Sequence, residues 1–296
     1  MARQGNIPAL YELASSQWGL ITSAQAVALG VSRTQLNRMV DDGRLELICY
    51  GVYRSTTGAE TAHVDIKAAW LSLYPKETAF DRLGKAPLDA IATGRTAAAL
   101  YSYGDFHAAP YCFATSRTKR TTRPDLELLR ADIDERDITR IFDIPCSTPE
   151  RIVADLIRMH EDPSLISDFM MGAATNGHFF DMQRLALLLD PLSRAHGFQS
   201  GHAFACDLID RSGVGALITT LAEKIEEALA SPDTTAVLGK LSSPANANGL
   251  MSALATFAAA LEYAYPSIRE DDAHANLESS TYQTRNRQEL CKPSRA

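Results

Sequence analysis

The chain has 296 residues, of which 46% are hydrophobic and 22% charged, a composition typical of a soluble globular protein with room for two domains. Its formal net charge of −7 argues against a protein that coats nucleic acid along its length. Five scattered cysteines without a C-x-x-C pair suit free thiols in a reducing compartment. Because neither a secretory signal nor an apolar run of ~20 residues is present, we expect a cytoplasmic protein without a membrane span.

A first helix is predicted over residues 5–18. Its apolar side chains recur at helical spacing and share one face: Ile7, Leu10, Tyr11, Ala14 and Trp18. A tryptophan at the end of such a stripe anchors a hydrophobic core more often than it stacks on a nucleic-acid base. We therefore expect Trp18 to lie in the core of an N-terminal domain.

Two further helix starts carry a capping box. Thr22-Ser23-Ala24-Gln25 and Ser32-Arg33-Thr34-Gln35 each place a glutamine three residues after a hydroxyl side chain, so that side chains can satisfy the free N–H groups of a helix start. The helix that begins at the Thr22 capping box is expected to end at about Leu29, because Gly30 follows. The second helix is expected to stop near Gly43, and it has one apolar stripe, formed by Leu36, Met39 and Val40.

A hairpin completes this N-terminal unit. Residues 45–48 and 52–54 are predicted strands around Tyr50-Gly51, a turn signal. Two capped helices followed by a hairpin predict a winged helix-turn-helix domain over residues 1–58, with its boundary in a run of small polar residues. The same elements also occur as a plain packing module, and that alternative stays open.

Polar side chains of the second capped helix and of the hairpin are the candidate DNA contacts. Arginine, asparagine, glutamine and threonine hydrogen-bond base edges and phosphates in a major groove. Asp41 and Asp42 would repel phosphate at the negative end of the helix dipole, so we expect contact mainly from the N-terminal half of this helix. The predicted DNA-binding residues are Ser23, Arg33, Thr34, Gln35, Asn37, Arg38, Arg44, Tyr50 and Arg54.

Charge is unevenly distributed along the chain. Residues 1–58 carry five arginines against four acidic residues, whereas residues 161–296 carry a net charge of −7. A weakly basic N-terminal domain on an acidic body suits binding to one site on double-stranded DNA, with modest phosphate contact.

A larger domain is predicted over residues 59–265. Helices are expected near 62–74 and 97–101 and from Ser147-Thr148-Pro149-Glu150 onward, and strands at 110–115, 126–129 and 138–144. From Ser164 the pattern is nearly all helical, and residues 266–296 are polar and aperiodic, so we expect a disordered tail. The fold class is therefore α+β: a winged helix-turn-helix domain followed by a larger mixed α/β domain that ends in helices.

One basic segment, residues 116–124, lies between two predicted strands. Its cationic side chains are Arg117, Lys119, Arg120 and Arg123. They are candidates for a second contact with DNA phosphates, with RNA or with an acidic partner. The alternative is a solvated loop without a binding role.

No motif of enzyme chemistry is present in the sequence. There is no P-loop, no G-x-S-x-G and no H-E-x-x-H, and His196 and His202 are six residues apart, which suits neither a helical metal site nor a zinc finger. We therefore expect a protein that is not an enzyme, with no catalytic residues, no metal and no cofactor.

Several segments, in order through about residues 5–190, resemble the AbiEi antitoxin family, the antitoxin half of type IV toxin–antitoxin pairs. As a combination, the Gly-Val-Tyr-Arg wing and the later Ser/Thr-Pro-Glu-Arg helix start are moderately specific. The matching pieces are Gly19-Leu20-Ile21-Thr22, Gly43-Arg44-Leu45, Gly51-Val52-Tyr53-Arg54, Gly94-Arg95-Thr96-Ala97-Ala98, and Ser147-Thr148-Pro149-Glu150-Arg151 with Asp155-Leu156.

The resemblance implies that the winged domain binds inverted repeats in operator DNA upstream of its own operon and represses it. It also implies that the larger domain counteracts a cognate nucleotidyltransferase toxin encoded next door. From the residues alone, two alternatives stay open: a stand-alone regulator whose larger domain senses a ligand or partner, and a nucleic-acid-processing enzyme with a winged targeting domain.

Overall fold

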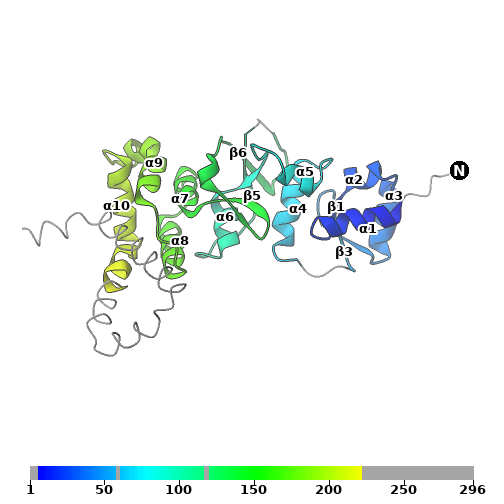
Figure 1. Ribbon diagram of the computed structural model, residues 1–296, viewed down its shortest axis with the longest axis horizontal. Coiled ribbons are helices and arrows are strands. Elements are labelled where there is room, and N and C mark those ends of the chain that lie inside the picture. Colours follow the sequence, from blue (N-terminus) through cyan, green and yellow to red (C-terminus); the bar gives the residue numbers. More distant parts are fainter. Residues whose placement is uncertain (1–5, 58–60, 117–119, 222–296) are drawn as a thin grey trace, which may run out of the picture. The chain divides into compact units, whose positions relative to one another are not determined.

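A computed structural model of the chain describes residues 6–57, 61–116 and 120–221 (Figure 1). By contacts within the chain it divides after Phe180, into one unit Met1–Phe180 and a second unit from Asp181 onward. The boundary predicted at residue 58 falls inside the first unit and stays a prediction. The predicted tail, residues 266–296, lies outside the described residues.

The first elements form the predicted winged helix-turn-helix, called here the winged-helix region (residues 6–57). They are α1 (Ile7–Ser16), β1 (Leu20–Thr22), α2 (Ser23–Ala28), α3 (Arg33–Asp41), β2 (Leu45–Cys49) and β3 (Val52–Ser55). The helix expected over residues 5–18 thus ends at Ser16, and Trp18 follows it with a left-handed φ of 63°. The strands form an antiparallel sheet in the order β1-β3-β2, in which the wing is the β2–β3 hairpin.

Both helices of the pair end in glycine. Gly43 has a φ of +70°, and the N–H groups of Gly43 and Arg44 donate to the carbonyls of Val40 and Met39, at 2.9 Å each. This is the bonding pattern of a Schellman motif, and only glycine adopts that φ without strain. The predicted stop of the second capped helix is therefore confirmed, and the chain turns directly into the wing.

The core of the winged-helix region joins all its helices to the wing. Its fully buried side chains include Leu10, Ile21, Val31, Leu36 and Met39. Burying each such side chain contributes roughly 1.5–3 kcal/mol relative to exposure. The buried stripe of α3 leaves the opposite face of that helix to solvent.

The following elements up to Phe180, called here the mixed-sheet region (residues 61–180), surround a five-stranded sheet. Its helices are α4 (Val64–Leu73), α5 (Ala79–Leu83), α6 (Gly94–Tyr101), α7 (Pro149–Arg158) and α8 (Pro163–Thr175), with a short 3-10 turn at Glu135–Asp137. Its strands are β4 (Ile91–Ala92), β5 (Tyr111–Thr115), β6 (Leu126–Arg130), β7 (Ile138–Ile141) and β8 (Ile144–Ser147), in the order β6-β5-β4-β8-β7. Parallel and antiparallel pairs mix in this sheet, so the predicted α+β class is confirmed.

The strand predicted over residues 138–144 is corrected to two strands. Phe142 and Asp143, both with left-handed φ values of 49° and 66°, turn β7 back onto β8. Two consecutive positive φ values are the geometry of a two-residue hairpin turn. Phenylalanine is not a turn residue, which is why the apolar run hides the turn.

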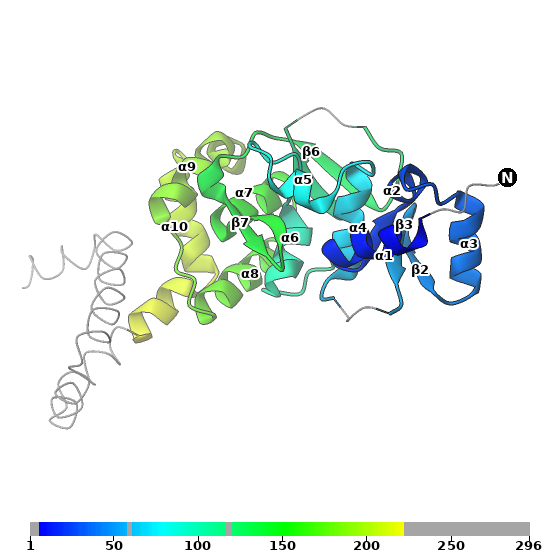
Figure 2. The same ribbon diagram turned by 45° about the vertical axis from the view of Figure 1, so that its right-hand side comes forward.

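Helix α4 packs against the winged-helix region. It contacts all three strands β1, β2 and β3, and also β5 of the larger sheet. Both ribbon views place α4 beside the winged-helix strands (Figure 2). Helix α4 therefore lies between the two sheets of the first unit.

The second unit, as far as residue 221, contains α9 (Met182–Ser193), a 3-10 turn at Arg194–His196 and α10 (Gly201–Arg211). The backbone of α10 approaches α9 closely at Gly201, where an added Cβ would lie 2.0 Å from the carbonyl oxygen of Ala186. Glycine at this position permits the close packing of the two helices. Among the residues that the structure describes, none of the helices has the length and apolar character of a membrane span.

Candidate nucleic-acid interface

The two capping boxes form as predicted and orient the helix pair. In α2, Thr22 Oγ1 accepts from the N–H of Gln25 at 3.1 Å, and Gln25 Oε1 accepts from the N–H of Thr22 at 2.9 Å. In α3, Ser32 and Gln35 exchange the equivalent bonds at 3.3 and 2.8 Å. The side-chain oxygen of Gln35, Oε1, is therefore used by the cap. Its side-chain NH₂ group is left for a contact with a base.

The solvent face of α3 carries most of the predicted DNA-contacting side chains. Arg33, Thr34, Asn37 and Arg38 are exposed, and Gln35 is half-buried. In the described part of the chain, the guanidinium groups of Arg33 and Arg38 have neither an ion-pair nor a hydrogen-bond partner. Their charges and donors are therefore available to a phosphate or a base edge.

The other two arginines of this region are already paired. Arg44 donates to Asp42 at 3.0 Å on the exposed end of α3, and Arg54 donates across the wing to Glu46 at 2.5 Å. Exposed pairs of this kind are weak, so a phosphate can replace the carboxylate. The net gain from such an exchange is smaller than the gain from an unpaired arginine.

The turn of the wing projects into solvent beside the start of α2. The side chain of Tyr50 is 82% exposed. Ser23 lies beneath the turn, because its N–H donates to the carbonyl of Gly51 at 2.8 Å. Ser23 and Tyr50 are thus brought together at one end of the helix pair, although no contact with nucleic acid follows from their position alone.

Only part of the basic segment falls within the described residues. Arg117 and Lys119 lie outside them, and Arg120 is exposed. The guanidinium of Arg123 turns inward, where it donates to Asp125 at 3.0 and 2.5 Å and to Ser72 Oγ at 2.7 Å.

Arg123 also lies beside the thiol of Cys49, the last residue of β2. Burial raises the pKa of the Cys49 thiol, while Arg123 acts in the opposite direction. The hydrogen bond with Asp125 raises the pKa of Arg123 and lowers that of Asp125. The C-terminal end of the basic segment is therefore attached next to the strand that leads to Tyr50.

Sequence reasoning missed one feature of this surface: the end of α1 and the start of α2 are bonded to the mixed-sheet region. Gln25 reaches the backbone of Glu77, and Gln17 reaches that of Ala79. The acceptor and donor atoms are backbone groups more than 50 residues away, so no local pattern could indicate them.

The mixed-sheet region also contains a cavity of about 540 Å³. Its lining is largely apolar, with Leu83, Pro87 and Ile138 among the wall residues and Lys85 and Arg140 as cations. Its volume is in the range of small-molecule sites. Within residues 6–57, 61–116 and 120–221, no group of three or more His, Cys, Asp or Glu side chains is placed to hold a metal ion.

One comparison with known protein families gives a match, and it falls within the winged-helix region. Residues 8–56 match the family described as "Transcriptional regulator, AbiEi antitoxin", so the match covers α1 to β3. The RV2827C protein from Mycobacterium tuberculosis has a similar solved structure: 69% of this chain and 76% of that chain are covered, with 14% identity and a TM-score of 0.44. The search of curated proteins gave no match. The N-terminal winged-helix region of this chain is therefore a transcriptional-regulator domain of the AbiEi antitoxin family.

Proposed function

We propose that this protein binds inverted repeats in the operator DNA of its own operon, represses that operon, and acts as the antitoxin against a cognate nucleotidyltransferase toxin. The observation that supports operator binding best is the exposed face of α3. Arg33, Asn37 and Arg38 lie on the exposed face of this capped helix, which belongs to a region that matches the AbiEi regulator family. The two arginines have no partner among the described residues.

In this proposal α3 enters the major groove. Arg33, Thr34, Asn37 and Arg38 read base edges or hold phosphates, and Gln35 contributes through its NH₂ group because its oxygen caps the helix. Supporting contacts come from residues at the start of α2, the end of α3 and the wing: Ser23, Arg44, Tyr50 and Arg54.

The basic segment supplies a second, weaker set of phosphate contacts in the same proposal. Arg120 faces solvent, and Arg117 and Lys119 precede it in the sequence. Arg123 is bonded to Asp125 and to Ser72 and lies beside Cys49 of the wing, so in this proposal it holds the segment in place and does not itself contact DNA. Replacing Arg117, Lys119 and Arg120 together by alanine should weaken binding to operator and random DNA alike.

The experiment that tests operator binding is a gel shift with the fragment upstream of this protein's own gene, beside random DNA of equal length. Selective binding that survives competitor DNA, with an affinity that falls as salt rises, is the expected result. The gel shift is run at a low and at a higher salt concentration. Equal affinity for the two fragments at both concentrations would refute site-selective binding.

The antitoxin role is tested separately, by co-expression with the neighbouring nucleotidyltransferase gene. We expect the full chain to restore growth, and an Arg33→Ala, Arg38→Ala variant to restore it equally when its own expression is driven from an unrelated promoter. Rescue by neither protein would refute the antitoxin role and leave the repressor. The family consists of transcriptional regulators and antitoxins, so we propose no catalytic step.

The cavity of about 540 Å³ favours a second candidate: a stand-alone regulator that senses a small ligand in its mixed-sheet region. This candidate predicts that a compound which binds, seen as a rise in melting temperature, also changes operator affinity, and that operator DNA changes the affinity for the compound by the same factor. A substitution that fills the cavity, Ala131→Phe, should abolish both effects. Absence of a nucleotidyltransferase gene beside this one would favour this candidate over the antitoxin.

A further inference from the structure

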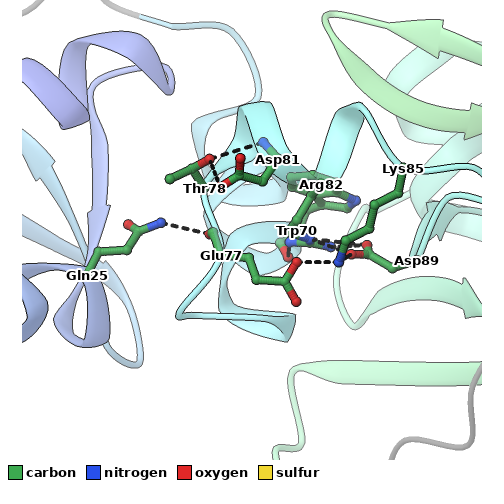
Figure 3. A network of polar contacts seen from close by, with 8 residues as sticks. All are labelled: Gln25, Trp70, Glu77, Thr78, Asp81, Arg82, Lys85 and Asp89. Carbon is green, nitrogen blue, oxygen red and sulfur yellow. Dashed lines mark hydrogen bonds and ion pairs between the residues drawn. The ribbon is translucent and has the colours of Figure 1, made fainter.

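Three side chains between the end of α1 and the start of α2 are joined to residues 75–79 by three hydrogen bonds. Gln25 Nε2 donates to the carbonyl of Glu77 at 2.8 Å, and the N–H of Ala79 donates to Gln17 Oε1 at 3.2 Å. Thr22 Oγ1 donates to the carbonyl of Pro75. Figure 3 shows the Gln25 amide pointing at the Glu77 backbone. We call these three bonds the bridge.

The side chains of the bridge are buried and their polar atoms are fully used. Gln17, Thr22 and Gln25 are 1%, 0% and 3% exposed. Gln17 Nε2 also donates to Gln25 Oε1 at 2.7 Å and to the carbonyl of Leu20 at 2.8 Å. Buried amides need partners for both their donors and their acceptors. In the observed placement of α2 on the 75–79 segment, all of these groups have partners.

The receiving side of the bridge is held by its own ionic network. Arg82, fully buried, forms a forked pair with Asp89 at 2.7–3.1 Å and donates to the carbonyl of Trp70 at 2.6 Å. Lys85 pairs with Asp89 at 3.2 Å and with the carboxylate of Glu77 (Figure 3). A segment fixed in this way gives the glutamines a rigid surface to bind.

A second contact lies next to Gln17, before β1. The rings of Trp18 and Trp70 meet edge to face, with centroids 5.9 Å apart, and the ammonium of Lys67 lies 5.4 Å from the Trp18 ring. Trp18 precedes β1 and Gln25 follows it. The strand that leads into α2 is therefore held by the mixed-sheet region at both of its ends.

We infer that Gln17 and Gln25 are positioning residues for DNA binding: the bridge holds α3 in one orientation on the mixed-sheet region, so that α3, the wing and Arg120 contact the same DNA duplex together. This inference rests on the proposed operator binding. Because both contacts belong to one chain, the second contact is intramolecular in any case, and a rigid connection orients it in advance and raises its effective concentration. A loose connection would let α3 and Arg120 bind independently and weakly.

Ala79→Pro removes one of the three bonds of the bridge, the one between Ala79 and Gln17. Ala79 is the first residue of α5, where proline fits a helix, and the preceding Thr78 already has the extended backbone that proline requires, with φ −77° and ψ 159°. The substitution removes the N–H that donates to Gln17 and puts a ring carbon in its place, at a position that is 3% exposed. Ala79→Ser is the matched control, because it keeps this N–H.

Gln25→Glu is the second variant. Glutamate keeps the oxygen that caps α2, as in an ordinary capping box, but cannot donate to the Glu77 carbonyl. The two variants change opposite sides of the bridge, so a shared effect on DNA binding cannot come from the local chemistry of one side.

Tryptophan fluorescence reports the state of the bridge without DNA, because the only two tryptophans in the sequence, Trp18 and Trp70, are the pair in contact. We expect both variants to unfold cooperatively, to be quenched more by acrylamide than the wild type, and to bind operator about tenfold more weakly, within the usual range of coupling between sites. Arg120→Ala should weaken operator binding in the wild type and much less in Ala79→Pro, as a double-mutant cycle would show.

The outcomes separate the inference from the proposed function. Variants with increased quenching but wild-type operator affinity would overturn the positioning role and leave operator binding intact. Unchanged quenching in both folded variants would also overturn it, because the bridge would then not hold the two parts together. A wild-type protein without selective DNA binding would refute the proposed function itself, whatever the quenching shows.

Discussion

Arginines lie on α3 and on α7, but the two helices present them to opposite surroundings. On α3, Arg33 and Arg38 are exposed and have no partner in the described part of the chain. On α7, Arg151 is buried and donates to Asp155 at 2.8 Å, and Arg158 also donates to this carboxylate. Thr93 Oγ1 donates to the same carboxylate at 2.6 Å.

The comparison shows how to assign a role to a motif. Ser147-Thr148-Pro149-Glu150-Arg151 with Asp155 is one of the motifs that suggest the AbiEi family, but the family match covers only residues 8–56, and Arg151 and Asp155 of this motif are paired with each other inside the protein. A buried and fully bonded cluster stabilises one packing arrangement, whereas an exposed and unpaired cation is free to bind. We therefore assign the cluster of Thr93, Arg151 and Asp155 to the stability of the fold, and the exposed face of α3 to DNA recognition.

The largest effect is expected from Asp155→Ala. Removing this carboxylate, which is 1% exposed, leaves the buried Arg151 without its counter-charge, which should cost about 3–5 kcal/mol of unfolding free energy. Urea denaturation measures the loss, and Asp168→Ala, at an exposed position of α8, is the control. A loss as small as that of the control would mean that the cluster is not structural, and would remove the contrast with α3.

A smaller effect, on binding and not on folding, is expected from Arg38→Ala. If the arginine reads a base, operator affinity should fall by ~1–3 kcal/mol, with random DNA little affected. The melting temperature should stay that of the wild type, because Arg38 is exposed. Arg211→Ala, an exposed arginine on α10, is the control. Equal losses on operator and random DNA would reassign Arg38 to a phosphate contact.

Arg54→Ala in the wing should have a weaker effect still. Arg54 must leave Glu46 to reach a phosphate, so we expect a modest loss of affinity for every DNA sequence and a salt slope lower by about 1. Affinity measured at several salt concentrations gives the slope. An unchanged slope would take Arg54 out of the interface. Glu46→Gln, which frees Arg54, should change affinity in the opposite direction.

The smallest expected effect concerns Arg123 and the thiol of Cys49. Burial raises the pKa of Cys49 and Arg123 lowers it, so Arg123→Gln should raise this pKa further. Because the thiolate is the reactive form, alkylation of Cys49 near pH 8 should become slower in the variant. Peptide mass spectrometry follows the rate, with Cys206 as the internal control. Unchanged kinetics would place Arg123 away from the wing and return it to the candidate DNA contacts.

The sequence by itself determined the helix pair and its solvent face. The capping boxes at Thr22 and Ser32 and the stop at Gly43 depend on partners within five residues, and the helical spacing of Leu36 and Met39 places them on one face of α3. Interactions over so few residues are determined by the spacing of residue types along the sequence, so they can be predicted without the rest of the chain. The exposure of Arg33, Asn37 and Arg38 follows from the same stripe.

Only the tertiary structure decided how that helix pair is held and which cations remain free. Gln25 finds its partner at Glu77, β1 finds its own at β3, and Arg123 turns toward Asp125, Ser72 and Cys49. A glutamine that caps a helix and a glutamine that also bridges to another region have the same local sequence signature. The difference lies in backbone groups brought close by folding, because burial forces every polar atom to find a partner, however distant in sequence.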